Sequence, residues 1–252
     1  MAASSGDPTT RAIDGPHFVV CPRFDRLGED GSSVRLGIMG GTFDPIHIGH
    51  LAVAEQAREA FGLAGVAFVP AGVPVFKLDR HVAPAEDRLE MCRRAVQDNP
   101  CFDVSDIEVR RAGITYTVDT LREMRAHYPG NVELCFIIGA DALASLPKWR
   151  ESAEVARLAS IIAVTRPGFA LDERVCAQVE AARFRVEYLE VTALSVSSSR
   201  LRDMLEQGMS IRYLTPDGVF DYIRERGLYG FGGSEAARGA SAVRSEEGNA
   251  SE

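Results

Sequence analysis

The 252-residue chain lacks several patterns that would place it in a membrane, a secretory route or a zinc-binding class. No stretch approaches 18 consecutive apolar residues, so we expect no membrane-spanning helix. The first ten residues are polar and lack the apolar core of a secretory signal. The five cysteines form no Cys-x-x-Cys pair, which disfavours a zinc ribbon or a thioredoxin-type redox site. Unpaired cysteines fit the reducing cytoplasm, where we expect the protein.

Basic residues are also in the minority, with 28 Lys and Arg against 36 Asp and Glu. A protein that coats nucleic acid usually carries a basic surface, so we expect no nucleic-acid partner. No cluster of His, Cys, Asp and Glu has metal-ligand spacing, and we expect no metal held by the protein itself. The hydrophobic share of 46% is typical of a globular domain. Self-association into a homo-oligomer stays open.

Composition divides the chain into three parts. Residues 1–33 are rich in Gly, Ser and Asp, and we expect a disordered extension. Its short apolar island at 17–21 either packs on the core or has no structural role. Residues 230–252 consist mostly of Gly, Ser, Ala, Glu and Arg and predict a disordered tail. Residues 34–229 carry the apolar patterns of a single folded domain.

Within that domain, short apolar runs alternate with helical patterns. The predicted strands are Val34–Met39, Val66–Pro70, Phe102–Val109, Val132–Ile138, Ser160–Thr165 and Arg185–Glu190. The predicted helices include His50–Phe61, Pro84–Asp98, Thr117–His127, one opening near Ser198 and a last one from Thr215-Pro216 through Arg226. This alternation predicts a Rossmann-like α/β fold, doubly wound, with a mostly parallel sheet and helices on both faces. Ligands of such sheets bind beyond the carboxyl ends of the strands.

The loop after the first predicted strand carries the strongest functional signal. It reads Gly40-Gly41-Thr42-Phe43-Asp44-Pro45-Ile46-His47-Ile48-Gly49-His50 and leads into a helix. Glycines let backbone N–H groups approach an anion, and a helix N-terminus adds partial positive charge. Two imidazoles here could donate to phosphate oxygens, with Gly49 leaving room for a ligand. A tight turn with histidines of no functional role is the plain alternative. Neither the Gly-Lys-Ser/Thr nor the Gly-x-Gly-x-x-Gly phosphate motif is present.

On these residues the chain resembles the HxGH nucleotidyltransferase superfamily, and more narrowly the bacterial nicotinate-mononucleotide adenylyltransferase family. The likeness covers about residues 35–229. Further segments match in the family's order: Val69–Lys77, Arg88-Leu89-Glu90-Met91, Gly113–Leu121, Ile138-Gly139-Ala140-Asp141 with Trp149, Arg166-Pro167-Gly168 and Val196–Arg202. The sequence departs from the family at Phe76, where histidine is common, and mildly at Val196 and Ser199.

The resemblance implies transfer of the adenylyl group of ATP to nicotinate mononucleotide, which gives deamido-NAD and pyrophosphate for NAD biosynthesis. It implies direct in-line attack without a covalent intermediate, and Mg²⁺ that enters on the ATP phosphates. The residues expected to act in catalysis are His47, His50, Lys77 and Arg202. The residues expected on the ATP side are Gly40, Gly41, Thr42, Phe43, His47, His50, Asp141, Ser198 and Arg202.

The resemblance likewise implies a mononucleotide side made of Asp44, Lys77, Thr115, Tyr116, Thr117, Trp149 and Arg166. Trp149 would stack on the pyridine ring, and backbone N–H groups near Thr115–Thr117 would bind the nicotinate carboxylate. Plain structural explanations also exist. Ser197–Ser199 could be a helix cap, Lys77 a solvated loop residue, Asp141 a helix cap and Trp149 a core residue.

Three alternative functions remain. His47-Ile48-Gly49-His50 also matches the HIGH motif of class I aminoacyl-tRNA synthetases, but the chain is short and has no Lys-Met-Ser-Lys-Ser loop. Another enzyme of the superfamily, such as phosphopantetheine adenylyltransferase, shares the first motif. A non-catalytic nucleotide-binding module on the same scaffold is the third.

Overall fold

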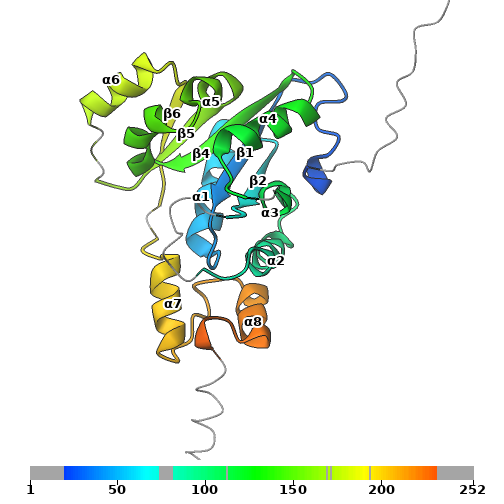
Figure 1. Ribbon diagram of the computed structural model, residues 1–252, viewed down its shortest axis with the longest axis vertical. Coiled ribbons are helices and arrows are strands. Elements are labelled where there is room, and N and C mark those ends of the chain that lie inside the picture. Colours follow the sequence, from blue (N-terminus) through cyan, green and yellow to red (C-terminus); the bar gives the residue numbers. More distant parts are fainter. Residues whose placement is uncertain are drawn as a thin grey trace, which may run out of the picture.

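A single parallel sheet organises the molecule (Figure 1). The structure is a computed structural model that describes residues 20–73, 82–111, 113–168, 170, 172–192 and 194–231. The strands lie in the order β3-β2-β1-β4-β5-β6, and each neighbouring pair is parallel. Their bounds are β1 (Val34–Gly41), β2 (Gly65–Pro70), β3 (Phe102–Val104), β4 (Val132–Gly139), β5 (Ser160–Thr165) and β6 (Val186–Glu190). Strand order reverses between β1 and β4, so the carboxyl ends of these two strands flank a crevice.

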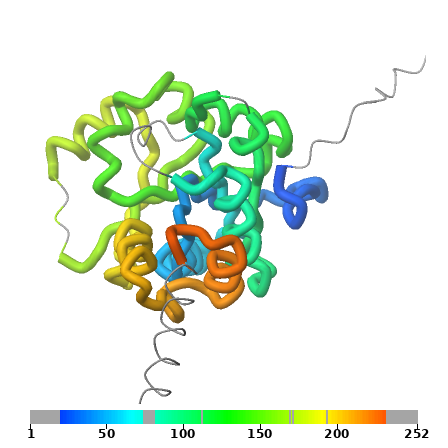
Figure 2. Tube along the Cα trace, turned by 60° about the horizontal axis from the view of Figure 1, so that its bottom comes forward, coloured from blue at the N-terminus to red at the C-terminus, as the bar shows by residue number. Residues whose placement is uncertain are grey.

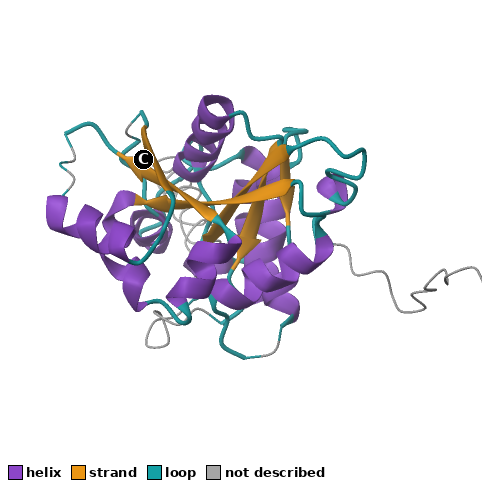
Figure 3. Ribbon diagram, turned by 90° about the horizontal axis from the view of Figure 1, so that it is seen from above, coloured by secondary structure: helices purple, strands orange, loops and turns teal. Residues whose placement is uncertain are grey.

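Helices cover both faces of the sheet, as the view in Figure 3 shows. One face packs on α4 (Thr117–His127), α5 (Ser152–Leu158), α6 (Glu173–Ala181) and the 3₁₀ segments η1 (Pro22–Phe24) and η3 (Ala140–Lys148). The other packs on α1 (Ile48–Phe61), α2 (Ala85–Val96), α7 (Ser198–Glu206), α8 (Asp217–Arg226) and the turn η4 (Leu228–Gly230). The described helices thus confirm the predicted doubly wound arrangement.

Side chains of the central strands alternate between two cores. In β4, Leu134 and Phe136 point into the core beneath α4, whereas Cys135 and Ile137 point into the core beneath α1. Every residue of β2 and β5 is buried. Burial on both faces is typical of parallel strands and explains why they appear in the sequence as continuous apolar runs.

The prediction of a strand over Phe102–Val109 is wrong beyond its first three residues. The chain leaves the sheet after Val104 and forms the short helix α3 (Ile107–Arg110). Ile107 is buried in the core beneath α4, and Val109 packs against the opposite core. Two apolar residues two positions apart therefore pack into the two different cores at the edge of the sheet, although they do not lie in a strand. Their spacing is the same as the alternation expected of a strand, which explains the wrong prediction.

The described chain joins the core before residue 34. Val20 and Cys21 are almost fully buried, and Phe24 is 8% exposed. The Arg23 guanidinium donates to the main-chain oxygens of Asn99 at 2.6 Å and Phe102 at 2.8 Å. Residues 20–33, which composition assigned to the extension, therefore lie on the domain, because a few apolar side chains and one arginine anchor them. The predictions for residues 1–19 fall outside the described residues.

The C-terminal boundary also lies later than predicted. Phe231 is 7% exposed and packs edge-on against Phe220, with ring centroids 5.4 Å apart. The predicted tail over 232–252 falls outside the described residues. Among the helices that the structure does describe, none combines the length and apolar character needed to cross a bilayer.

The contact between Phe24 and β2 gives a stability test. A Cβ on Gly65 would lie 2.2 Å from the Phe24 ring, so Gly65→Ala must displace that ring. We expect Phe24→Ala to lower the free energy of unfolding by about 3 kcal/mol or more. Gly65→Ala should be destabilising alone but add little in the Phe24→Ala background. Urea unfolding of both single variants and the double variant measures this coupling, and additive effects would contradict it.

Candidate active site

A cavity of about 930 Å³ opens at the carboxyl ends of β1 and β4. Its walls come from the loops after β1, β4, β5 and β6 and from the start of α4. The sequence-predicted residues that line it are Gly40, Gly41, Thr42, Phe43, His47, His50, Thr115, Thr117, Asp141, Trp149, Arg166 and Ser198. Asp44, Tyr116 and Arg202 are not among its lining residues, and Lys77 falls outside the described residues.

The glycines at the end of β1 are required by close packing. A Cβ on Gly41 would lie 2.9 Å from the Phe43 ring, and one on Gly40 would lie 3.2 Å from the Phe136 ring. Phe43 itself has a φ of 49°, in the left-handed region that non-glycine residues rarely adopt. Its ring packs edge-on against the His50 ring, with centroids 5.1 Å apart. The bend therefore brings backbone and imidazole together on one wall of the cavity.

The two histidines form a stacked pair. Their ring centroids lie 3.7 Å apart with an interplanar angle of 20°. The His47 backbone N–H donates to His50 Nδ1 at 3.2 Å. Since Nδ1 accepts, the neutral His50 ring carries its proton on Nε2. His50 is thereby set as a donor through Nε2.

His47 is neutral at pH 7 in this environment. Its side chain is buried, and this burial lowers the pKa of the imidazole to about 4. Its Nδ1 is shielded from solvent beside Gly49, and the His47 ring as a whole lines the cavity.

Gly49 explains the spacing of the pair. A Cβ at this position would lie 3.0 Å from His47 Nδ1. The missing side chain makes room for the His47 ring. Gly49 also lines the cavity, so the expectation that it leaves room for a ligand stays a prediction.

Another part of the cavity wall is built by the segment from η3 to Trp149 and by the start of α4. Trp149 Nε1 donates to Ser145 Oγ at 3.0 Å, and its ring meets Phe136 edge-on at 6.0 Å. Trp149 also packs against the apolar core, so the core interpretation and the cavity interpretation both hold. Tyr116, the residue before α4, makes no side-chain cap, so the first N–H groups of that helix lack a capping side chain.

Asp141 follows the end of β4. A Cβ on Gly139 would lie 2.3 Å from Asp141 Oδ1, so glycine is needed for this carboxylate to turn back over the strand end. The Asp141 side chain is exposed at the cavity wall. This arrangement accounts for the Gly-x-Asp spacing.

Glu108 is a cavity residue that the sequence did not single out. It accepts a hydrogen bond from Thr120 Oγ1 at 2.6 Å. Burial raises the pKa of its carboxyl group, and its hydrogen bonds from Thr120 and Thr115 oppose that rise. Its position in a predicted strand hid it, because the strand prediction left no loop there.

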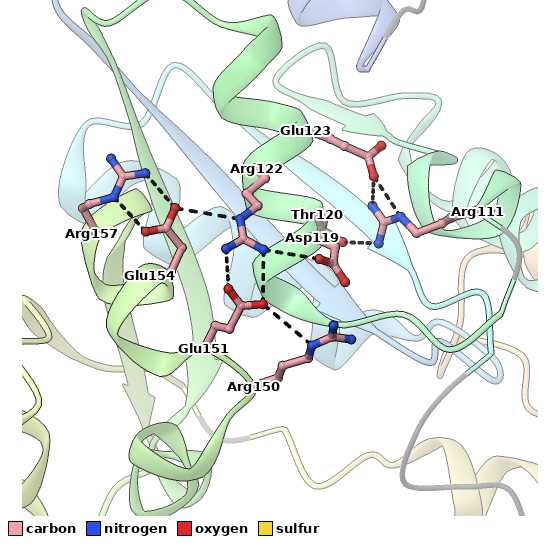
Figure 4. Close-up of polar contacts among 9 residues, drawn as sticks. All are labelled: Arg111, Asp119, Thr120, Arg122, Glu123, Arg150, Glu151, Glu154 and Arg157. Carbon is pink, nitrogen blue, oxygen red and sulfur yellow. Dashed lines mark hydrogen bonds and ion pairs between the residues drawn. The ribbon is translucent and has the colours of Figure 1, made fainter.

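Ion pairs join α4, whose first residue is Thr117, to the start of α5, which follows shortly after Trp149 in the chain, as Figure 4 shows. Arg122 on α4 pairs with Glu151 and Glu154 at the start of α5. On the other side of α4, Arg111 pairs with Glu123 and donates to Thr120 Oγ1 at 3.3 Å. A single exposed ion pair contributes little stability. Together, these ion pairs favour one position of α4 relative to the start of α5, close to Trp149 in the chain.

Asp44 and Arg202, predicted to face different substrates, face each other. Asp44 is 2% exposed, and its Oδ2 lies 3.4 Å from Arg202 Nη1. The same Nη1 donates to the Asp44 main-chain oxygen at 2.6 Å. Ser198 Oγ donates to the Pro45 main-chain oxygen at 2.9 Å. Both residues of α7 thus hold the loop after β1.

The serine cluster that opens α7 also caps it. Ser197 Oγ accepts from the Arg200 N–H at 3.4 Å, which confirms the helix-cap interpretation for this residue. Ser197, Ser198 and Ser199 all line the cavity. In the part of the chain that the structure describes, no group of three or more His, Cys, Asp or Glu side chains is arranged to hold a metal ion.

Arg88, from the Arg-x-x-Met segment, also lies beneath the site. Its side chain is 1% exposed and donates to the main-chain oxygens of Thr42 at 2.9 Å, Gly72 at 2.8 Å and Ala83 at 3.0 Å. One guanidinium therefore ties the loop after β1 to the loop after β2. The planar, five-donor shape of arginine suits three carbonyls at once.

Comparison with known proteins agrees with this site. Residues 38–204 match the cytidylyltransferase-like family. Two similar proteins carry the name probable nicotinate-nucleotide adenylyltransferase. The one from Desulfitobacterium hafniense is 48% identical over 201 residues, which cover 77% of this chain and 95% of that protein. The one from Roseiflexus sp. is 48% identical over 199 residues, which cover 79% of this chain and 99% of that protein.

A solved structure shares the fold. The Plasmodium falciparum nicotinic acid mononucleotide adenylyltransferase complexed with NaAD superposes with a TM-score of 0.65 at 21% identity, covering 79% of this chain and 98% of that one. A structural match at 21% sequence identity shows a shared fold and nothing about function. The sequence relatives decide the family: this chain belongs to the nicotinate-nucleotide adenylyltransferases, within the cytidylyltransferase-like group.

Proposed function

We propose that the protein transfers the adenylyl group of ATP to nicotinate mononucleotide, releasing pyrophosphate and forming deamido-NAD. Relatives named for this activity match most of the chain. The observation that carries the proposal is that one cavity is lined both by the stacked His47–His50 pair and by Trp149 and the start of α4. A single cavity of about 930 Å³ that contains both groups suits two nucleotides that react with each other.

The ATP phosphates would lie against the loop after β1. In this proposal His50 Nε2–H and the His47 ring donate to the α-phosphate, where negative charge increases in the transition state. Backbone groups of Gly40–Phe43, together with Ser198, would line the phosphates, and Asp141 would accept from ribose hydroxyls. Arg202 contributes to this end through the Asp44 loop, and direct phosphate contact by Arg202 remains a prediction.

The mononucleotide would lie toward Trp149. Its nicotinate carboxylate would accept from the N–H groups at the start of α4 beside Thr115 and Thr117, and its ring would stack on Trp149. Arg166 lines this cavity and is a candidate for the mononucleotide phosphate. The proposed contacts of Lys77, Tyr116 and Asp44 with this substrate stay predictions.

The reaction needs no side-chain base. A phosphate oxygen of nicotinate mononucleotide, already an anion, would attack the α-phosphorus of ATP as the bond to the β-phosphate oxygen breaks, and that oxygen leaves with pyrophosphate. The barrier comes from bringing two anions together, so positioning and fixed hydrogen-bond donors supply the catalysis. We expect ATP to enter as its Mg²⁺ complex, and we expect the enzyme to act in the cytoplasm without nucleic-acid partners.

The decisive test of function compares acceptors. With ATP and Mg²⁺ present, we expect nicotinate mononucleotide to release pyrophosphate with a kcat/KM at least about ten-fold above that of the uncharged amide, because donors arranged for an anion are left unpaired by the amide. Phosphopantetheine serves as the control acceptor. Turnover of phosphopantetheine alone would assign the chain another reaction, and ATP binding without turnover of any acceptor would favour a non-catalytic module.

The histidine pair gives a second test. We expect His50→Ala to lower kcat by about 10²-fold or more, as removal of a transition-state donor does, while the Kd for ATP changes much less. His127→Ala is the matched control, since His127 pairs with Asp25 at 3.1 Å and does not line the cavity. Equal losses in kcat and ATP affinity would contradict a transition-state role for His50.

Trp149 tests the mononucleotide end. We expect Trp149→Ala to raise the KM for nicotinate mononucleotide by about ten-fold, in line with about 0.5–1.5 kcal/mol for an aromatic contact beyond area burial, and to leave the KM for ATP nearly unchanged. Trp149→Phe should recover part of the loss. Steady-state kinetics with each substrate varied in turn measures this, and an unchanged KM for the mononucleotide would rule out ring stacking.

A further inference from the structure

A hydrogen bond from the C-terminal turn reaches the loop that carries the histidine pair. Tyr229 lies in η4, after α8, and its hydroxyl donates to Asp44 Oδ1 at 2.7 Å. Asp44 lies three residues before His47 and is 2% exposed. In Figure 2 the C-terminal turn and α8, in orange and red, lie beside the blue segment that holds this loop.

The buried Asp44 carboxylate depends on donors from distant parts of the chain. Besides Tyr229, Oδ1 accepts from the Ala83 N–H at 3.1 Å, and Oδ2 lies 3.4 Å from Arg202 Nη1. A carboxylate this buried is stable only when such donors surround it. Burial and the Asp44 charge both raise the pKa of the Tyr229 hydroxyl, so it stays protonated as a donor.

The backbone of the turn is bent in a way that presents this hydroxyl. Tyr229 has a φ of 55°, a left-handed conformation that is costly for a residue with a side chain. The turn is held in place from both sides, because Gly227 ends α8 with a φ of 60° and Phe231 is buried against Phe220. A costly conformation that aims one hydroxyl at one buried carboxylate suggests that the contact has a function.

We propose that Tyr229 is a positioning residue for adenylyl transfer: by holding the Asp44 carboxylate, its hydroxyl fixes the loop that sets His47 and His50 against the reacting phosphate. This rests on the proposed function, since it concerns the same site. Tyr229 touches neither substrate. It acts through Asp44. The hydrogen bond between Tyr229 and Asp44 reaches the histidines through the loop from Asp44 to His47, which has no regular secondary structure.

The chain contains a closely matched control. Tyr222 on α8 donates to Asp87 Oδ1, also at 2.7 Å. Asp87 is likewise buried and likewise has an arginine nearby, Arg226 Nε at 3.3 Å. Asp87 lies on α2 and does not line the cavity. Tyr222→Phe therefore removes the same kind of bond at a carboxylate whose side-chain partners, Tyr222 and Arg226, lie on α8 rather than on the loop of the histidine pair.

The experiment compares Tyr229→Phe with Tyr222→Phe in the full-length chain. Loss of a hydrogen bond to a buried carboxylate should lower the Tm of both variants by similar amounts. Well below both Tm values, we expect Tyr229→Phe to lower kcat by about ten-fold or more, because small displacements of positioned groups are costly, with less than about a two-fold change in either KM. Tyr222→Phe should keep the wild-type kcat. Equal kcat values in the two variants would overturn the proposal.

A second measurement does not depend on turnover. The NMR titration of the His47 ring, identified by its absence in His47→Asn, should give a pKa near the value of about 4 expected in the wild-type protein. We expect that pKa to move up toward 6.5 in Tyr229→Phe, because a released loop admits water to the ring, and to stay in place in Tyr222→Phe. Identical His47 titrations in both variants would contradict the proposal. If the wild-type protein fails to use nicotinate mononucleotide, the proposed function falls, while the titration still decides the role of Tyr229.

Discussion

The main constraint on this structure is that the chain between β1 and α1 must satisfy its buried polar groups without regular secondary structure of its own. A buried main-chain oxygen left unpaired is costly, so each needs a donor. The donors come from far along the chain. Arg88 donates to the Thr42 oxygen, Arg202 to that of Asp44, Ser198 to that of Pro45 and Thr215 to that of Ile46. The loop that carries the histidine pair is therefore positioned by distant parts of the domain: by α2 through Arg88, by α7 through Ser198 and Arg202, and by Thr215 before α8.

This arrangement bears on how the proposed chemistry would work. The paired histidines are held by stacking and by a main-chain hydrogen bond, so their donor directions are set before any substrate enters. The lowered pKa of His47 makes that ring a neutral donor at pH 7, so it carries no charge that would be left unpaired when pyrophosphate leaves. Donors fixed in advance cost no reorganisation during the reaction, which is the main advantage of a folded site over water. For a reaction between two anions, such prearranged hydrogen-bond donors and correct positioning of the substrates are the main requirements.

Much of the fold could be predicted because parallel strands buried on both faces leave an unmistakable apolar pattern, as in Ser160–Thr165, whose bounds agree with β5. The loop motif was visible because its glycines and histidines lie together in the sequence. The pairing of Asp44 with Arg202 was not visible, because nothing in one sequence says which of many charged residues meet across more than 150 positions. Glu108 escaped because apolar spacing around it imitated a strand, which left no loop there. The apolar island at 17–21 was visible, but its packing on the core could not be predicted, because a run this short has no periodic pattern.

At the proposed mononucleotide end, charge alone would not explain a preference for an acid. Arginines lie close to the start of α4, yet Arg111 and Arg122 are paired with Glu123 and Glu151, and Arg150 lies over the Tyr116 ring at 4.6 Å. Glu108, a carboxylate, lines the same region. A nicotinate carboxylate placed here would meet few uncommitted positive charges on these side chains, so its attraction would have to come from the uncapped N–H groups of α4, aided by the dipole of that helix. Directional N–H donors of this kind bind an acceptor oxygen favourably and leave no acceptor partner when the NH₂ group of an amide takes its place. A simple positive charge would discriminate less strongly between the two groups. In this proposal the ion pairs around α4 would support selectivity by holding that helix end in place rather than by contacting the substrate.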